Sequence, residues 1–332
     1  MAEPFRSERT AVILAGGDSA RLGALTREIF GEEMPGQFCR LWGKHTPLEQ
    51  TLRRAALVID PSRTLTVLTA QHARWYEPLL SSIGAAGPAA VQPLNRGTAP
   101  AILYALMRLK KIAPDSAVAL FPSGHFVADD QTFMSHVEAA FGAVDARPEA
   151  TVLLGIEPTD PDPDYGWIEA GQFLTNQREA VRHVLHFWER PAPKVAQCLY
   201  SMGCLWNSFL TVARLSTLLG LFLITLPCLS KTFTAIESEL GTSSEQTRVQ
   251  RLYSRIWPSD FSREVLARCP INLAMLQVSR VEWSDLGEPQ RVIRLFAGRG
   301  AVQPPRDVVR FAQQATRTFR ESRLGSAGVC NK

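Results

Sequence analysis

Short apolar runs alternate with amphipathic segments through the first half of the chain. The runs cover residues 10–14, 65–69, 90–92, 117–121 and 151–156, and their continuous apolar character predicts buried strands. Helical spacing of apolar residues marks 48–59, 99–112 and 130–141, with Thr98 as the expected N-cap of the second helix. Strands that alternate with helices predict a mostly parallel, three-layer α/β sheet.

The pattern loosens from about residue 160. Clusters of Trp, Pro and acidic residues at 160–169, 187–193 and 205–209 suggest loops, whereas 274–278 and 281–283 suggest strands. The longest apolar run, 218–229, is too short to cross a bilayer and predicts a buried helix.

Bulk composition is that of a folded protein with a mildly basic net charge. The 332 residues are 45% hydrophobic and 20% charged, with a net charge of +4, which suits polyphosphate but is too small to indicate nucleic acid. None of the six cysteines forms a C-x-x-C pair, and the first residues lack an apolar stretch. We therefore expect a cytoplasmic protein with reduced thiols and no membrane partner.

The most informative segment is LAGGDSARLG, residues 14–23, directly after the first predicted strand. Gly16 and Gly17 remove side chains where a backbone must approach a ligand, and Arg21 adds a charge that can grip phosphate oxygens. No GK[ST] follows and GxGxxG is absent, so this is neither a Walker loop nor a dinucleotide fingerprint. A plain structural turn remains the alternative.

Eight motifs in order resemble the mannose-1-phosphate guanylyltransferase (GDP-mannose pyrophosphorylase) family over roughly residues 9–290. They are LAGG-x-x-x-RL at 14–22, PGQF at 35–38, QPLNRGTAPAI at 92–102, PSGH at 122–125, YGWIE at 165–169, FWERP at 187–191, LWNS at 205–208 and WSDLG at 283–287. Each motif is weak alone, and their order makes the resemblance specific. We expect no counterpart of the C-terminal sugar-isomerase domain that longer members carry.

The resemblance implies a Rossmann-like nucleotidyltransferase fold with an added sugar-binding α+β part. Its domain would be residues 1–300, with a nucleotide-binding half at about 9–160 and a sugar-phosphate-binding half at about 161–290. Residues 301–332 would form an Arg-rich C-terminal extension. A homo-oligomer is left open.

The implied reaction joins a sugar 1-phosphate to a nucleoside triphosphate and releases pyrophosphate, with mannose 1-phosphate and GTP as the family's substrates. The catalytic residues would be Arg21, Arg190 and Asp285, and Asp285 would bind Mg²⁺ or another divalent cation. The family pattern assigns the nucleotide to Ala15, Gly16, Gly17, Arg21, Gln92, Asn95, Gly97 and Thr98, and the sugar phosphate to Gly166, Glu189, Arg190 and Asn207. Both substrates are anions, so such a site must cancel charge and align the reactants.

Three positions depart from the family pattern. Gly124 stands where the family has a metal-binding Asp, Gly36 where it has Lys, and Arg190 where it has Lys. Loss of a carboxylate and a lysine would slow turnover, so a catalytically weak or silent homologue that binds nucleotide or NDP-sugar and regulates a partner remains the alternative function.

Several of these residues also have purely structural interpretations. Asp285 would cap the turn before Gly287, Asn207 would cap a local turn, and Glu189 with Arg190 would form a surface ion pair. Asp129 and Asp130 fit the start of a helix better than a metal site.

Overall fold

The computed structural model describes residues 8–41, 43–84, 87–174 and 181–297. Contacts divide these residues into two units. The first unit contains residues up to 17 together with 51–123 and 127–283, and the second contains 18–50, 124–126 and the residues from 284 onward. The predicted C-terminal extension, 301–332, lies outside the described residues.

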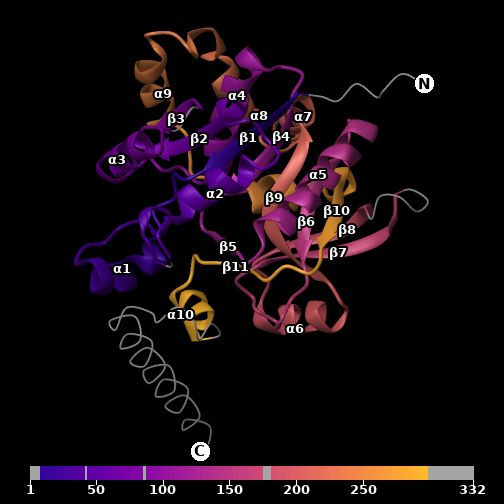
Figure 1. The fold of residues 1–332 in the computed structure, drawn as a ribbon. Coiled ribbons are helices and arrows are strands. Elements are labelled where there is room, and N and C mark those ends of the chain that lie inside the picture. Colours follow the sequence, from indigo (N-terminus) through magenta and orange to yellow (C-terminus); the bar gives the residue numbers. More distant parts are fainter. Residues whose placement is uncertain (1–7, 42, 85–86, 175–180, 298–332) are drawn as a thin grey trace, which may run out of the picture. The chain divides into compact units, whose positions relative to one another are not determined.

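A nine-stranded sheet forms the framework of the first unit, in the order β3-β2-β1-β4-β9-β6-β10-β8-β7 (Figure 1). Strands β3, β2, β1 and β4 are mutually parallel, as are β6 and β10, while β9 lies antiparallel between β4 and β6. The strands are β1 (Arg9–Leu14), β2 (Thr64–Thr69), β3 (Ala89–Gln92), β4 (Ala117–Pro122), β6 (Thr151–Ile156), β7 (Gly166–Phe173), β8 (Val181–Glu189), β9 (Leu205–Arg214) and β10 (Leu273–Val278).

Helices cover both faces of this sheet, which confirms the three-layer α/β architecture. One face packs against α4 (Thr98–Ile112), α7 (Leu215–Thr225) and α8 (Pro227–Thr234), and the shared core includes Val12, Leu106 and Phe222. Alternate strand residues face α5 (Asp130–Ala146). The other helices of this unit are α3 (Ala73–Ile83), α6 (Pro193–Ser201) and α9 (Glu245–Tyr253), while α2 (Pro47–Ala55) crosses the division between the units.

The second unit is smaller and has its own apolar core. Helices α1 (Gly23–Phe30) and α10 (Pro289–Ala297) contribute Leu25 and Val292, which pack with Phe126 and Leu286. Strands β5 (His125–Val127) and β11 (Trp283–Asp285) form a two-stranded sheet. No helix among the described residues has the length and apolar content that a bilayer crossing requires.

Three predictions about local structure were wrong. The Trp-rich clusters near 165, 188 and 206 are parts of β7, β8 and β9, because aromatic side chains suit the half-buried surface of a sheet. The run 218–229 is two helices, since Pro227 starts α8. Gly97 is the N-cap of α4 and Thr98 its first helical residue, because the Thr98 hydroxyl bonds a distant segment instead of the helix end.

Candidate nucleotide and sugar-phosphate site

The glycine turn begins where β1 ends, at the carboxyl edge of the parallel strands. Ala15 donates its backbone N–H to Val67 at 2.9 Å, which fixes the chain to β2. The Gly16 carbonyl accepts from the Thr69 hydroxyl at 2.7 Å, and Thr69 accepts from Gln92 Nε2 at 2.9 Å. A Cβ on Gly16 would lie 2.4 Å from Gln92 Nε2 and 2.8 Å from Thr69 Oγ1, so a side chain there would displace this hydrogen-bonded pair.

Gln92 lies at the end of β3 with only 1% of its surface exposed. Its amide nitrogen bonds Thr69, and its oxygen accepts from the Tyr253 hydroxyl at 3.3 Å. The Gln92 side chain is therefore linked to the glycine turn through Thr69. Its direct contact with a nucleotide stays a prediction.

The β3–α4 loop, residues 93–97, brings the next predicted residues together. Asn95 Oδ1 accepts from the Gly97 backbone N–H at 3.0 Å, which closes a tight turn. Gly97 has φ 86° and ψ −179°, a conformation that is almost restricted to glycine. Thr98 donates its hydroxyl to Asp260 Oδ2 at 3.1 Å and accepts from the Phe261 N–H at 2.8 Å. The loop is thus built rigidly on residues from far along the chain.

Three of the predicted sugar-binding residues converge on neighbouring strands of the first unit. Gly166 of β7 pairs with Glu189 of β8, and a Cβ on Gly166 would lie 2.9 Å from Glu189 Oε2 and 3.2 Å from the Asn207 Cβ. Asn207, in β9, is buried and accepts from the Phe209 N–H at 3.1 Å, so the turn-capping bond is present as well. Glycine at 166 thus lets a carboxylate and an amide lie close together.

Aromatic rings back this cluster. Tyr165 stacks on Trp206 with 4.2 Å between ring centroids and 25° between ring planes. Trp167 is fully buried and donates Nε1 to the Asp162 carbonyl at 3.1 Å, so it serves packing and not sugar stacking. These rings thus pack the start of β7 against β9, next to Gly166 and Asn207.

Arg190 follows β8 in an unusual backbone conformation. Its φ is 50°, although it is not glycine and precedes Pro191, which restricts the preceding residue to extended conformations. Its Nε lies 3.7 Å from Glu189 Oε1, so the predicted ion pair exists, and 47% of its side chain is exposed. Nearly half of the Arg190 side chain is therefore accessible to solvent.

Arg21 and Asp285 belong to the second unit, where each has a charged partner. Arg21 forms an ion pair with Glu288, just before α10. Asp285 Oδ2 accepts from Arg291 Nη1 at 3.0 Å, and Oδ1 accepts from the Gly287 N–H at 2.8 Å. The turn before Gly287 is thus capped by Asp285, while a carboxylate retains further lone pairs for a cation.

Gly36 and Gly124, which both depart from the family pattern, have different surroundings. A Cβ on Gly36 would lie 2.5 Å from Leu22 Cδ1, the end of a flexible side chain, whereas a Cβ on Gly124 would meet nothing within 4 Å. Gly124 also accepts from the Leu286 N–H at 3.0 Å, through its backbone, which any residue can do. The space needed for a side chain is therefore present at Gly124.

Asp285 is the carboxylate for which the sequence predicts a role in binding a cation, and that role stays a prediction. Nowhere in the described part of the chain do three or more His, Cys, Asp or Glu side chains gather to hold a metal ion. Asp129 caps α5 by accepting from the Thr132 N–H at 3.0 Å, as predicted. Asp285 alone fits the way Mg²⁺ is held by one or two carboxylates and by substrate phosphates.

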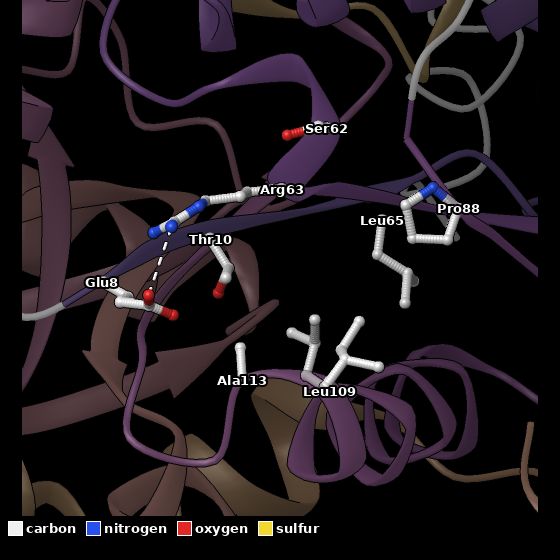
Figure 2. Close-up of a pocket in the computed structure, with 9 residues that line it drawn as sticks. Glu8, Thr10, Ser62, Arg63, Leu65, Pro88, Leu109 and Ala113 are labelled. Carbon is white, nitrogen blue, oxygen red and sulfur yellow. Dashed lines mark hydrogen bonds and ion pairs between the residues drawn. The ribbon is translucent and has the colours of Figure 1, made fainter.

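A cavity of about 320 Å³ lies at the opposite edge of the sheet, where β1 and β2 begin (Figure 2). An ion pair of 3.2 Å between Arg63 and Glu8 forms one side, and Leu65 and Leu109 form an apolar side. Its lining contains Glu8, Thr10, Ser62, Arg63, Leu65, Pro88, Leu109, Ile112 and Ala113, and thus no predicted site residue.

The sequence reasoning missed the residues that support the site. Thr69, Tyr253, Ser259 and Asp260 all bond predicted site residues or their neighbours. Thr69 ends a predicted strand beside the glycine turn, which was a usable signal. The segment 253–261 lies more than 150 residues from the loop that it contacts, so no local pattern could identify it.

Comparison with known proteins agrees with this arrangement. The family model described as nucleotidyl transferase matches residues 10–298. The chain is 33% identical over 211 residues to the alginate biosynthesis protein AlgA of Pseudomonas putida, a stretch that covers 63% of this chain and 42% of that protein. It is 30% identical over 210 residues to a mannose-1-phosphate guanylyltransferase of Salmonella montevideo, covering 62% and 43% respectively. The chain therefore spans less than half the length of these relatives.

Solved structures share the fold. A structure titled mannose-1-phosphate geranyltransferase, from Thermus thermophilus, aligns over 87% of this chain and 79% of its own, with a TM-score of 0.74 and 25% identity. A UDP-glucose pyrophosphorylase complexed with UDP-glucose covers 88% of this chain and all of its own, with a TM-score of 0.54 and 11% identity. The latter likeness concerns the fold alone.

Proposed function

Because the chain belongs to the nucleotidyl transferase family, we propose that it transfers a nucleotidyl group from a nucleoside triphosphate to a sugar 1-phosphate. A phosphate oxygen of the sugar attacks the α-phosphorus, the bond to the β-phosphate breaks, and pyrophosphate leaves. The family match across residues 10–298 carries this proposal. The convergence of Gly166, Glu189 and Asn207 supports it, since a carboxylate and an amide suit sugar hydroxyls.

GTP and mannose 1-phosphate are the proposed substrates, because a mannose-1-phosphate guanylyltransferase is among the relatives. In this proposal Ala15, Gly16 and Gly17 approach the nucleotide through their backbone, with Asn95, Gly97 and Thr98 beside it. Gly166, Glu189 and Asn207 bind the sugar. We place the reaction in the cytoplasm.

Charge cancellation is the main catalytic task, since both reactants are anions. Arg21 would bind the triphosphate and Arg190 the sugar phosphate, each with a guanidinium suited to two phosphate oxygens. Glu288 and Glu189, their present partners, would exchange these contacts for solvent. Asp285 would hold Mg²⁺, which when bound neutralises phosphate charge and polarises the phosphoryl group.

The test is release of pyrophosphate by the purified protein in MgCl₂ with a matrix of four nucleoside triphosphates and several sugar 1-phosphates. We expect the highest rate with GTP and mannose 1-phosphate. Substitution of Glu189 by Gln keeps the shape of the side chain and should raise KM for the sugar phosphate more than KM for GTP. Calorimetric binding of GTP without turnover of any pair would contradict the proposal and favour the silent homologue.

A further inference from the structure

The β3–α4 loop is held from outside by a segment that lies in none of the eight family motifs. Ser259 donates its N–H to the Arg96 carbonyl at 3.0 Å, and its own carbonyl accepts from the Ala99 N–H at 3.2 Å. A Cβ on Gly97 would lie 2.3 Å from that same Ser259 carbonyl. The segment 253–261 and the loop therefore fit together without room for a side chain between them.

Tyr253 connects the two ends of the loop. Its hydroxyl lies 3.3 Å from Gln92 Oε1, just before the loop, and 3.3 Å from the Pro100 carbonyl, just after it. Its backbone carbonyl accepts from Arg96 Nε at 3.0 Å, within the loop. One residue thus contacts the start, the middle and the end of this segment.

The contact with Gln92 extends to the glycine turn. A hydrogen bond from Tyr253 holds the Gln92 oxygen, which leaves the amide nitrogen directed at Thr69, and Thr69 in turn donates to the Gly16 carbonyl. Reversal of the Gln92 amide would place its oxygen against Thr69, whose hydroxyl hydrogen is already used. Thr69 therefore sets the orientation of the Gln92 amide, and the Tyr253 hydroxyl completes this chain of bonds as the donor that faces the Gln92 oxygen.

Asp260 fixes the other end of the loop. Its Oδ2 accepts from the Thr98 hydroxyl at 3.1 Å, while its Oδ1 accepts from the Arg263 N–H at 2.9 Å. The Thr98 hydroxyl accepts in turn from the Phe261 N–H. The first residue of α4 is thereby tied to the end of the segment 253–261.

Packing alone does not account for the Tyr253 hydroxyl. The ring is fully buried against Tyr104 and Phe233, and a phenylalanine would keep those contacts. Burial also raises the pKa of the hydroxyl well above its usual value, with a smaller effect of Tyr104, so the group stays a donor at neutral pH. A buried hydroxyl that contacts two acceptors on either side of one loop is a specific orienting device.

We propose that Tyr253 and Asp260 are positioning residues that fix the β3–α4 loop and the glycine turn for the nucleoside triphosphate. This inference rests on the proposed function. It adds residues from the second half of the chain to the nucleotide site, and it predicts that their loss affects the nucleotide more than the sugar phosphate.

Tyr253→Phe is the sharpest variant, and Tyr104→Phe is its matched control. Tyr104 is buried in the same aromatic cluster, but its hydroxyl bonds Glu245 and does not touch Gln92. We expect Tyr253→Phe to raise KM for GTP about 3- to 10-fold, the effect of one lost hydrogen bond, with kcat and KM for the sugar phosphate changed less than about 2-fold. Tyr104→Phe should leave KM for GTP unchanged.

Asp260 is tested with a conservative pair. Asp260→Ala removes both acceptors and should raise KM for GTP about 10-fold or more, whereas Asp260→Asn keeps one acceptor oxygen and should recover most of the loss. Thermal unfolding of every variant verifies that the fold persists. A rise for Asp260→Asn equal to that for Asp260→Ala would mean that charge and not positioning matters.

Calorimetric titration with GTP and MgCl₂ separates the positioning role from the proposed function. Active or GTP-binding wild-type protein with an unaffected Tyr253→Phe variant would overturn the inference and leave the proposed function intact. An equal loss in Tyr253→Phe and Tyr104→Phe would also overturn it, because general loosening of the core would then explain both. Wild-type protein that neither binds GTP nor releases pyrophosphate would overturn the function and the inference together.

Discussion

Gly97 in the first unit and Gly124 in the second are both motif glycines, and their surroundings are opposite. Gly97 has φ 86°, and a Cβ there would lie 2.3 Å from the Ser259 carbonyl. Gly124 has nothing within 4 Å of the position that a Cβ would take. Glycine is therefore required by packing at 97 and is not required at 124.

This contrast shows how a departure from a family pattern can be interpreted. The β3–α4 loop is closed around its glycine by partners from 253–261, so any side chain there would move backbone. At Gly124 the fold would accept the carboxylate that the family carries. A carboxylate at 124 would thus leave the packing of the described residues unchanged.

Gly97→Ala should have the greatest effect of the substitutions considered. It forces alanine into a backbone region that is nearly restricted to glycine and against a carbonyl, so we expect a loss of about 3 kcal/mol in the free energy of unfolding. Urea unfolding measures this, with Gly17→Ala as the control, because no atom lies within 4 Å of a Cβ at Gly17. Equal stability of the two variants would show that packing does not require glycine at 97.

Asp285→Asn tests whether the acid in the second unit acts in chemistry as well as in packing. We expect pyrophosphate release to fall about 10- to 100-fold, since the amide cannot neutralise a cation. The free energy of unfolding should fall by only about 1 kcal/mol, because the amide oxygen can still accept from Gly287 or Arg291. Undiminished turnover would leave Asp285 with its structural role alone.

Gly124→Asp tests the open glycine directly. We expect a gain of about tenfold in pyrophosphate release, through a second carboxylate for the cation, and a change in stability within about 0.5 kcal/mol. Gly124→Ala is the control, since it occupies the same space without charge. A large loss of stability in both variants would show that the position is closed after all.

The reaction rates of two cysteines test whether the second unit is loosely packed. Cys39 is fully buried in its core, and burial, with a smaller effect of Glu32, raises the pKa of the thiol to about 12. Iodoacetamide at pH 8 should therefore modify exposed Cys198 of the first unit at least about tenfold faster than Cys39. Mass spectrometry of the labelled peptides measures both, and equal rates would indicate a loose second unit.

The pattern of apolar residues predicted the parallel strands correctly, because burial of each of these strands is visible in its own sequence. The runs at 10–14, 65–69 and 117–121 are short, apolar and bounded by turn residues, and they became β1, β2 and β4. The prediction of loops for the Trp-rich stretches was wrong because these residues form strands by pairing with distant segments, as Gly166 pairs with Glu189. Such pairing leaves no apolar period in the sequence.

Only part of the candidate site could be predicted from the sequence, because its other residues come together through contacts between distant segments. Gly16 was singled out because glycine after a strand lets a backbone approach a ligand, and Gly97 because it lies in one of the motifs that resemble the family. The reason for each glycine, however, is a distant side chain or carbonyl, from Gln92 and Ser259 respectively. Tyr253 and Asp260 stand in unremarkable helical and polar stretches, and only the folded chain places them against the loop.

The backbone at Arg190 matters for directed evolution. A positive φ before a proline favours glycine or asparagine, so a library randomised at 190 and screened for heat resistance alone should enrich those two residues. Neither carries a positive charge. If Arg190 has the proposed role, a screen for thermal tolerance and a screen for turnover would therefore select different residues at this codon, and the difference would measure the stability that the arginine costs.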